Sequence, residues 1–530
     1  MTRISAALAA VLLASTAVPA LAATPRDALV IAATIDDITS LDPAEIFEFS
    51  GGDVANNVYD TLLSIDPKAL DKGYVPGIAE SWSVSADGLT YTFKIRQNLK
   101  FHSGNPITAD DVVFSLARAV KLNKTPAFIL NQFGLTKDTV DQKVRKTGTH
   151  EVVMTIDKAF APSMVLNCMT ATLTSVVDMK VAMANQKDGD FGYEYLKTRS
   201  AASGQYRLVN WKASDGYTLE RVDGNWQGDA TLKRVIVRHV PETASQRLLL
   251  TKGDVDIARD LSPDDVDAVK KDPNLKVEDD LKGRITYFSA NQKHPILSKP
   301  GVVEAMKYLV DYDGLRATIL RGRAVVHQAF EPRTFLGAID DAPYRLDVEK
   351  AKDLLTKAGY PNGFNIQMDV RSGYPTTEMA QSIQSTFARA GIKMEIIPGD
   401  GRQTLTKYRA RTHDLYIGAW GPDYPDPHTN ADTFARNPTN NADDAKGTGY
   451  LTWRNAWAIP QMTVQTDAAV MEKDNGKRAQ MYGDIQREHQ RTSPFVIIYQ
   501  QLVQTGMRKN VQGFHSGGPV SSAYYWTVKK

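Results

Sequence analysis

Cysteine is almost absent from the 530-residue sequence, in which Cys168 stands alone. A disulfide within the chain is therefore impossible, and metal cages built from several cysteines are excluded. An excess of charge of one sign is also lacking, because 63 Lys and Arg stand against 61 Asp and Glu, a formal net charge of +2. This balance gives no support for nucleic acid or an anionic membrane as a partner. A chain of this length is expected to form two or three domains with ample buried area.

The usual catalytic motifs are missing too. The sequence has no G-x-S-x-G, H-E-x-x-H, Walker or G-x-G-x-x-G pattern. His413 and His428 flank one predicted strand, but a zinc site needs at least one further spaced ligand. We therefore expect no metal or other cofactor, and we do not expect an enzyme. A glycosidase needs only two carboxylates, so a secreted hydrolase remains the alternative from another functional class.

Long hydrophobic runs are confined to the N-terminus. A positive Arg3 precedes an apolar stretch over 6–17, and small residues follow up to Ala22. The apolar stretch is shorter than the about 20 residues that a membrane span requires. We therefore predict that residues 1–22 are a secretory signal, cleaved after Ala22 or, as the close alternative, after Ala23. No cysteine lies at the cleavage site, so a free periplasmic protein is expected rather than a lipid-anchored one.

Alternating patterns predict an antiparallel hairpin in the first quarter of the chain. Residues 81–96 form two alternating arms around a glycine-containing turn at 85–88. Thr108 and the acidic residues after it resemble a capping box, which predicts a helix over 109–120. A further helix is expected over 54–63.

Strands and helices alternate in the second half of the chain. Strands are expected over 364–370, 392–397 and 415–420, with a helix from 377 and another over 405–411 between them. This order predicts a parallel sheet with right-handed crossovers. A last strand over 494–499 has no local partner, which leaves a return to an earlier domain open.

Two charged residues follow strands of this sheet. Arg371 comes after the first strand and Asp423 after the last. Ligands of open parallel sheets lie beyond the carboxyl ends of the strands. A guanidinium suits a carboxylate and an aspartate suits an ammonium group, so this pair could hold both ends of a zwitterion. Trp420 and Tyr424 flank Asp423 and could supply flat apolar walls. The alternatives are a solvated arginine and a turn-forming aspartate, and Asp426 is expected to be structural.

Motifs along nearly the whole chain from Leu41 onward are similar to one family. They are Val75–Trp82, Asp87–Arg96, Phe101–Gly104, Thr108–Val112, Lys252–Ile257, Ala351–Leu355, Ala358–Phe364 and Trp420–Pro427. In these motifs the sequence resembles the peptide/nickel/opine class (family five) of periplasmic solute-binding proteins that serve ABC importers. The resemblance implies an α/β fold of two lobes, with a hinge of two crossing segments and an extra hairpin-rich domain.

The resemblance also implies domain boundaries and a function. The first lobe would comprise residues 23–58, 180–280 and 495–530, the extra domain 59–179 and the second lobe 281–494. The implied function is capture of a peptide or peptide-like solute by cleft closure and its delivery to an inner-membrane permease. We expect a monomer. A receptor for an opine or an oligosaccharide on the same fold remains an alternative.

Site residues follow from the same resemblance. Asp423 is implied to bind the α-amino group of the ligand, and Arg371 is the nearest match to an arginine that binds its carboxylate. The expected ligand-binding set is completed by Trp420, Tyr424, Gly421, Tyr374, Trp453 and Phe49. Two segments depart from the pattern of relatives, at 201–205 and 223–226, and they leave the class of ligand open.

Overall fold

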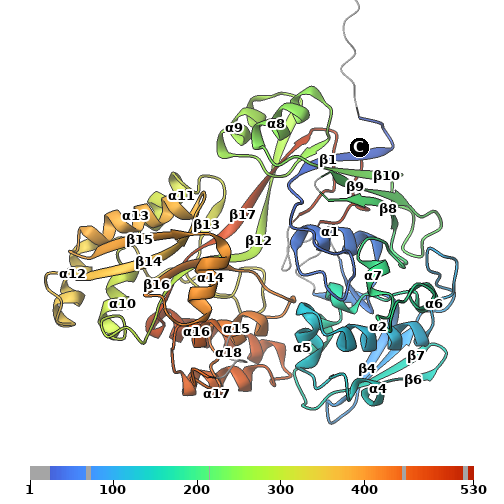
Figure 1. Ribbon diagram of the computed structural model, residues 1–530, viewed down its shortest axis with the longest axis horizontal. Coiled ribbons are helices and arrows are strands. Elements are labelled where there is room, and N and C mark those ends of the chain that lie inside the picture. The colour runs from blue at the N-terminus through green and yellow to red at the C-terminus, as the bar shows by residue number, and fades with distance from the viewer. Residues whose placement is uncertain (1–23, 67–72, 214, 444–448, 517–522) are drawn as a thin grey trace, which may run out of the picture.

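The computed structural model of the chain describes residues 24–530, apart from 67–72, 214, 444–448 and 517–522. The predicted signal over 1–22 lies outside these residues. Figure 1 shows two lobes side by side, joined by two long strands. This arrangement confirms the predicted two-lobed α/β fold. Within the described part of the chain, no helix combines the length and apolar character needed to cross a bilayer.

The first lobe is built around a short, fully buried strand. This strand, β1 (Ala28–Ala33), pairs in parallel with two neighbours, and its six residues are all buried. Its neighbours are β10 (Arg234–His239) and β11 (Ile257–Ala258), and β9 (Gly216–Arg221) and β8 (Tyr206–Lys212) extend the sheet beyond β10. The helices α8 (Thr243–Lys252) and α9 (Pro263–Lys271) stand beside it. The sequence of β1 is apolar without interruption, as expected for a parallel strand that is buried on both faces of its sheet.

The helix expected over 54–63 begins earlier and ends earlier, because α1 spans Phe49–Val58. Glycines at 51 and 52 weaken the helical pattern of its first turns, so the sequence alone sets the start too late. Tyr59 has an extended backbone, with φ −108° and ψ 156°, which ends the helix. The apolar residues after it belong to β2 (Leu63–Ile65), which pairs with β3 (Tyr74–Pro76). This shift places Phe49 at the first turn of α1.

The extra domain contains the predicted hairpin. Its sheet has the order β4 (Ala79–Val84), β5 (Thr90–Ile95), β7 (Glu151–Thr155) and β6 (Val144–Gly148), with all neighbours antiparallel. Gly88 closes the turn with φ 76°. Alternate residues of β5, namely Tyr91, Phe93 and Ile95, face the core. The predicted capping box of Thr108 and Asp111 is present at the start of α2 (Ala109–Leu122). The helices α3 (Phe128–Asn131), α4 (Val140–Lys143) and α5 (Pro162–Cys168) follow. The next helices along the chain, α6 (Met179–Ala184) and α7 (Tyr193–Leu196), pack against the core of the first lobe.

The second lobe has the parallel strands that the sequence predicts. The strands β14 (Asn365–Arg371), β15 (Lys393–Gly399) and β16 (Leu415–Trp420) are parallel, with β14 in the middle. The helices α13 (Thr376–Ala388) and α14 (Gly401–Arg409) connect them. The sheet is not parallel throughout, because β16 pairs antiparallel with the hinge strand β12 (Leu275–Ala290).

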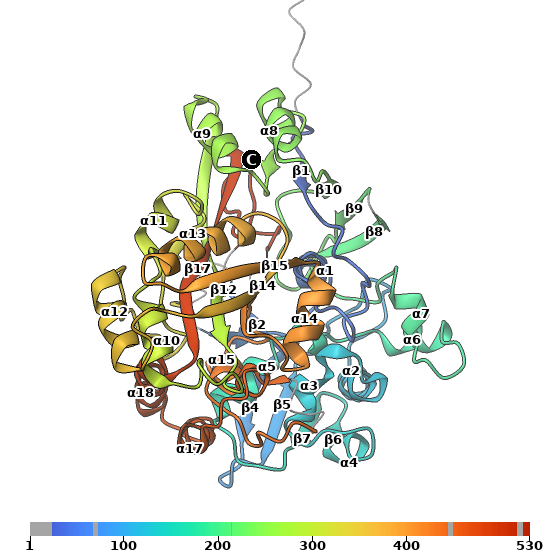
Figure 2. The same cartoon turned by 60° about the vertical axis from the view of Figure 1, so that its left-hand side comes forward.

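Helices cover both faces of this sheet (Figure 2). Neighbouring hinge-strand residues point to opposite faces, so Phe288 packs in one apolar cluster and Tyr287 in the other. The first cluster includes residues of α13, α10 (Pro300–Lys307), α11 (Tyr312–Ala317) and α12 (Val348–Lys357). The second includes residues of α14, α15 (His428–Phe434), α16 (Leu451–Arg454), α17 (Pro460–Ala469) and α18 (Asn475–Thr492). The sheet thereby holds the loop after β16 at a fixed position.

The hinge consists of two long antiparallel strands, β12 and β17 (Phe495–Arg508) (Figure 1). The strand predicted over 494–499 is thus the start of β17, which returns to the first lobe and pairs with β11. The pairing slips in the middle, because Leu281 pairs with Leu502 and the next pair is Ile285 with Gln500. Three residues of β12 therefore lie opposite a single residue of β17. A bulge of this kind bends a strand, as a connection between lobes requires.

The lobes also contact each other away from the hinge. The backbone N–H of Ala161 in the extra domain donates to the carbonyl of Val470 in the second lobe, at 2.8 Å. The hydroxyl of Ser163 donates to Oδ1 of Asn475 at 3.1 Å. Tyr424 of the second lobe is buried within the apolar core of the extra domain. The two lobes therefore touch directly through the extra domain as well as through the hinge strands.

Candidate functional site

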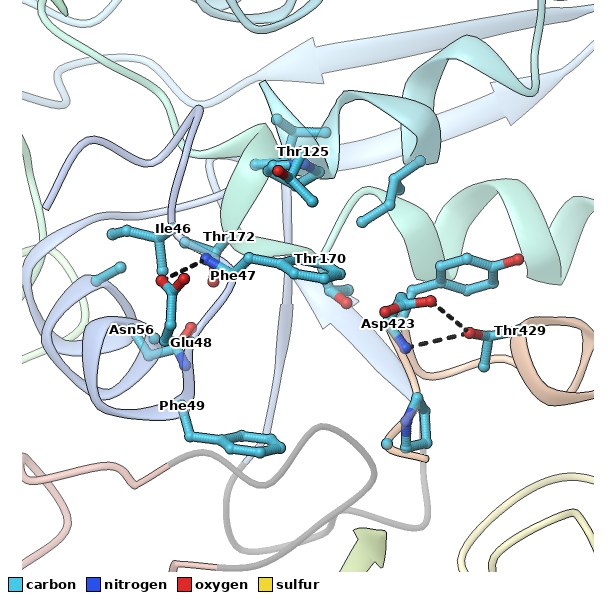
Figure 3. A pocket seen from close by; sticks show the side chains of 18 of the residues that line it. Ile46, Phe47, Glu48, Phe49, Asn56, Thr125, Thr170, Thr172, Asp423 and Thr429 are labelled. Atoms are coloured by element: carbon cyan, nitrogen blue, oxygen red, sulfur yellow. Dashed lines mark hydrogen bonds between the residues drawn. The ribbon is translucent and has the colours of Figure 1, made fainter. Parts of the chain in front are cut away.

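A cavity of about 950 Å³ lies between the lobes. The first lobe contributes the loop before α1 and residues of that helix from Phe49 to Asn56, and the extra domain contributes α3 and the segment around 170–175. The second lobe contributes the loop that joins β16 to α15. Figure 3 shows Phe47, Glu48 and Phe49 on one side and Asp423 with Thr429 on the other. Because both lobes line the cavity, a molecule bound in it would contact both.

Asp423 stands in the loop after β16, where the sequence places a ligand-binding residue. Its backbone N–H donates to Oγ1 of Thr429 at 3.1 Å, and the same hydroxyl lies 3.5 Å from one carboxylate oxygen (Figure 3). Within the described residues, no Lys, Arg or His nitrogen forms an ion pair with this carboxylate. Both oxygens therefore keep acceptor capacity toward the cavity.

The surroundings of Asp423 disfavour its charge. Burial raises the pKa of this carboxyl to about 7, and the nearby carboxyl of Asp432 adds to the rise while the hydrogen bond from Thr429 opposes it. An approaching cation would reverse this shift, because an opposite charge favours the ionised carboxylate. The surroundings of Asp423 thus leave its charge without a compensating Lys, Arg or His among the described residues.

Four other expected residues line the same cavity. Trp420, at the end of β16, is half-buried and donates from Nε1 to Oδ1 of Asn430 at 3.1 Å. Tyr424 follows Asp423 and reaches into the core of the extra domain. Gly421 faces the first lobe, since a Cβ built on it would lie 3.5 Å from Cζ of Phe49. The structure thus brings these four residues together with Asp423 around one cavity.

The remaining three expected residues lie outside the lining of this cavity. Arg371, at the end of β14, is exposed and lies against Gly401. Tyr374 is exposed, and its hydroxyl donates to the carbonyl of Ile319. Trp453 is buried, donates from Nε1 to the carbonyl of Asn441 at 2.7 Å, and has the guanidinium of Arg411 4.5 Å from its ring centre.

Several lining residues were not singled out from the sequence. Arg409, at the end of α14, and Arg454, in α16, bring positive charge to the cavity, and burial together with the charge of Arg454 lowers the pKa of Arg409. Phe47 and Phe128 bring apolar surface. The arginines follow no recognisable motif. One feature of the sequence could have indicated that the phenylalanines are exposed. They lie at the starts of helices and not within a stretch whose apolar residues recur at helical or strand spacing.

Asp426 has the structural role that the sequence suggests. Its two carboxylate oxygens accept hydrogen bonds from Nη1 and Nη2 of Arg478 at 2.7 and 2.6 Å, and both side chains are fully buried. Burial alone would raise the pKa of Asp426, but the charge and hydrogen bonds of Arg478 outweigh it and hold that pKa below its usual value. This pair anchors the loop that carries Asp423 to α18.

Metal ligands do not gather in the described residues, where no group of three His, Cys, Asp or Glu side chains has the geometry to hold an ion. His413 and His428 are both buried in the second lobe, and burial lowers their pKa values to about 4 and about 3. They are neutral imidazoles at physiological pH.

The chain has relatives among characterised proteins. A sequence model of the bacterial extracellular solute-binding proteins, family 5 (middle region), matches residues 73–442. The dipeptide-binding protein of Escherichia coli K12 is 26% identical over 457 residues, which cover 83% of each chain. A probable D,D-dipeptide-binding periplasmic protein of the same organism is 27% identical over 514 residues, covering 96% of this chain and 95% of that protein.

Solved structures agree with the fold. A structure of HbpA2 from Haemophilus parasuis superimposes with a TM-score of 0.81 at 22% identity, covering 94% of this chain and 99% of that chain. A periplasmic binding protein from Helicobacter pylori, in complex with the peptide STSA, superimposes with a TM-score of 0.78 at 22% identity, covering 95% of this chain and 98% of that chain.

Proposed function

Because the chain belongs to the family 5 bacterial extracellular solute-binding proteins, we propose that its interlobe cavity captures a peptide or peptide-like solute by the primary amine. The chain is the substrate-binding component of an ABC importer. Its expected place is the periplasm, and its expected partner is an inner-membrane permease. A peptide ligand is supported by the names of the two E. coli relatives, both of which are described as dipeptide-binding.

The observation that carries the proposal is the carboxylate of Asp423. It lines the interlobe cavity, lacks an ion-pair partner among the described residues and has its pKa raised to about 7. A charge in such surroundings is costly unless it is paired. An ammonium group supplies both the charge and three N–H donors, which suits an acceptor with free lone pairs.

The opposite end of a peptide carries a carboxylate. Arg409 and Arg454 line the cavity, so they are the best candidates to bind this carboxylate. Arg371 remains the candidate by resemblance, but it lies outside the cavity lining. A bidentate guanidinium contact would add geometric selectivity for a planar carboxylate.

Closure follows from the arrangement of these groups. Asp423 belongs to the second lobe, whereas Phe49 and Glu48 belong to the first. Contacts from both lobes to one ligand exist only when the cleft is shut, so the ligand shifts the hinge equilibrium toward the closed form. The permease would then receive the closed, loaded form.

An opine and a sugar are the alternative ligands of the cavity. Solved opine-binding proteins share the fold, including one described in complex with mannopinic acid at a TM-score of 0.75, so an opine with a protonated amine would fit the same role of Asp423. Trp420 would also suit the face of a sugar. A secreted hydrolase has less support, because the family consists of solute-binding proteins.

A thermal-shift screen of the mature protein tests the proposal. The ligands are Ala-Ala, N-acetyl-Ala-Ala, mannopinic acid and maltotriose, each in excess. Free Ala-Ala should stabilise the protein by about 2.7 kcal/mol at a hundredfold excess over its Kd, and the acetylated peptide should not. Stabilisation by the opine or the sugar alone would contradict the peptide assignment. Native mass spectrometry of freshly purified protein would identify a co-purified ligand.

A further inference from the structure

Three phenylalanines expose large apolar surface around the cavity. Phe47, Phe49 and Phe128 are 46, 48 and 41% exposed, and all three line the cavity. They are all of the phenylalanines among the large apolar residues exposed in the described part of the chain. Single exposed apolar residues need no explanation, but a gathered patch indicates a surface that something else covers.

The local backbone places these rings on one wall. Glu48 has an extended backbone, with φ −92° and ψ 150°, at the N-cap position of α1. Its neighbours Phe47 and Phe49 both line the cavity (Figure 3). Phe128 begins α3, and its ring contacts that of Phe47 edge-on, with centres 6.2 Å apart at 87°. This contact, between segments distant in the sequence, holds the wall in place before any ligand binds.

The wall reaches the loop that carries Asp423. A Cβ on Gly421, two residues before Asp423, would lie 3.5 Å from the ring of Phe49. Figure 3 shows Phe47 and Phe49 extending from the first lobe toward Asp423. An amine held by Asp423 therefore brings the substituent on the adjacent carbon close to these rings.

Glu48 is the charged group on this wall. A carboxylate that faced the cavity would favour a cationic substituent on the ligand. Its Oε2 accepts a hydrogen bond from the backbone N–H of Phe47 at 3.2 Å (Figure 3). This carboxylate is therefore turned toward its own backbone, whereas the rings on either side of it face the cavity. The apolar surface is larger, and it favours an apolar occupant.

We propose that Phe47, Phe49 and Phe128 form a subsite for a large apolar side chain on the residue whose amine Asp423 binds. The subsite rests on the proposed function, since it requires an amine at Asp423. It gives a preference for peptides that begin with a large apolar or aromatic residue over peptides that begin with a small one. Desolvation of the ligand side chain and of the exposed rings provides the preference.

Calorimetric titration with four dipeptides tests the subsite. Phe-Ala should bind about tenfold more tightly than Ala-Ala, because burying a phenylalanine side chain is worth that factor or more. Ala-Phe and Lys-Ala should stay within about threefold of Ala-Ala. Phe47→Ala should reduce the advantage of Phe-Ala to about threefold or less. Leu248→Ala is the matched control, because Leu248 is 47% exposed on α8 and outside the cavity lining, and it should leave the ratio unchanged.

The wild-type ratios decide the outcome whether or not a variant folds. Equal affinities for Phe-Ala and Ala-Ala, or a preference for Lys-Ala, would overturn the subsite while leaving peptide binding intact. Failure of all four peptides to bind would instead contradict the proposed function, and the subsite with it.

Discussion

The backbone N–H of Ala161 donates to the carbonyl of Val470 across the two lobes, at 2.8 Å, although neither residue lines the cavity. Ser163 continues this contact, because its hydroxyl donates to Asn475 at 3.1 Å and accepts from Nη1 of Arg478 at 3.2 Å. The arrangement of the lobes in this structure is thus stabilised by contacts that involve no ligand atom. A protein that closes over its ligand can gain affinity from such contacts by favouring the binding-competent state.

Removing the Ser163 contacts should weaken every ligand by the same factor. Ser163→Ala is expected to lower the affinity about threefold to tenfold, as one or two hydrogen bonds contribute, and to act mainly on the dissociation rate. Ser298→Ala is the control, because among the described residues its exposed hydroxyl donates only to the carbonyl of Pro295 in the second lobe. Stopped-flow and calorimetric measurements with two different peptides check this. Unequal losses for the two peptides would mean that Ser163 acts on the ligand and not on closure.

Binding of a cationic ligand should depend on pH through Asp423. Its pKa is raised to about 7 without a ligand, so below pH 7 it must lose a proton before it can pair with an ammonium group. The peptide amine stays protonated over this range. Affinity should therefore fall as the pH is lowered, by about 15-fold between pH 7 and pH 5.5.

Other titratable groups near Asp423 also affect how binding depends on pH. Burial raises the pKa of Asp432 to about 6 against the opposing charge of Arg436, so a weaker second titration is expected. His428 stays neutral, since burial lowers its pKa to about 3. Calorimetry in buffers of different ionisation enthalpy should detect proton release near pH 6 in the wild type. Asp423→Asn should abolish most of that release, and an unchanged release in this variant would assign it to another group.

The buried ion pair of Asp426 and Arg478 should govern stability. Asp426→Ala leaves the Arg478 guanidinium buried without its counter-ion, which should lower the free energy of unfolding by about 3–5 kcal/mol. Arg487→Ala is the control on the same helix, because Arg487 is 54% exposed and pairs with Asp341 and Asp484 at the surface. That change should cost at most about 1 kcal/mol. Urea denaturation would contradict the assignment if both variants lost the same stability.

Changing the carboxylate end of the ligand distinguishes Arg409 from Arg371 as the residue that binds it. Arg409→Ala should weaken a free dipeptide about tenfold, because it removes charge from the cavity wall, and should not affect the C-terminally amidated peptide. Arg371→Ala should change neither peptide by more than about twofold, because Arg371 lies outside the lining. Fluorescence or calorimetric titration of both peptides checks this. The reverse pattern would restore Arg371 as the carboxylate ligand.

The sequence predicted the elements whose signals are local. The hairpin around Gly88, the capping box at Thr108 and the parallel strands before Arg371 and Asp423 all appear as expected. Each depends on side chains within a few residues of one another, so periodicity and turn chemistry suffice. The predicted start of α1 was wrong, because two glycines in its first turns hide the helical pattern of the sequence.

The cavity was predicted only in part. Asp423 could be found because it follows a strand in a recognisable motif. Arg409, Phe47 and Phe128 reach the cavity through the packing of separate lobes, and no spacing in the sequence records that. Trp453 shows the converse, since an aromatic residue that suits a ligand face is buried against Arg411 instead. Long-range packing decides which polar and aromatic side chains face a shared space.

The role of Asp423 is tested most directly by a calorimetric comparison of Ala-Ala and N-acetyl-Ala-Ala on the wild type and on Asp423→Asn at pH 7.5. If Asp423 holds the ligand's amine, acetylation and the substitution should each cost at least about 30-fold in affinity. Together they should cost little more than either alone, because both remove one ion pair. Full affinity of Asp423→Asn for free Ala-Ala, or fully additive losses, would contradict the claim that Asp423 holds the ligand's amine.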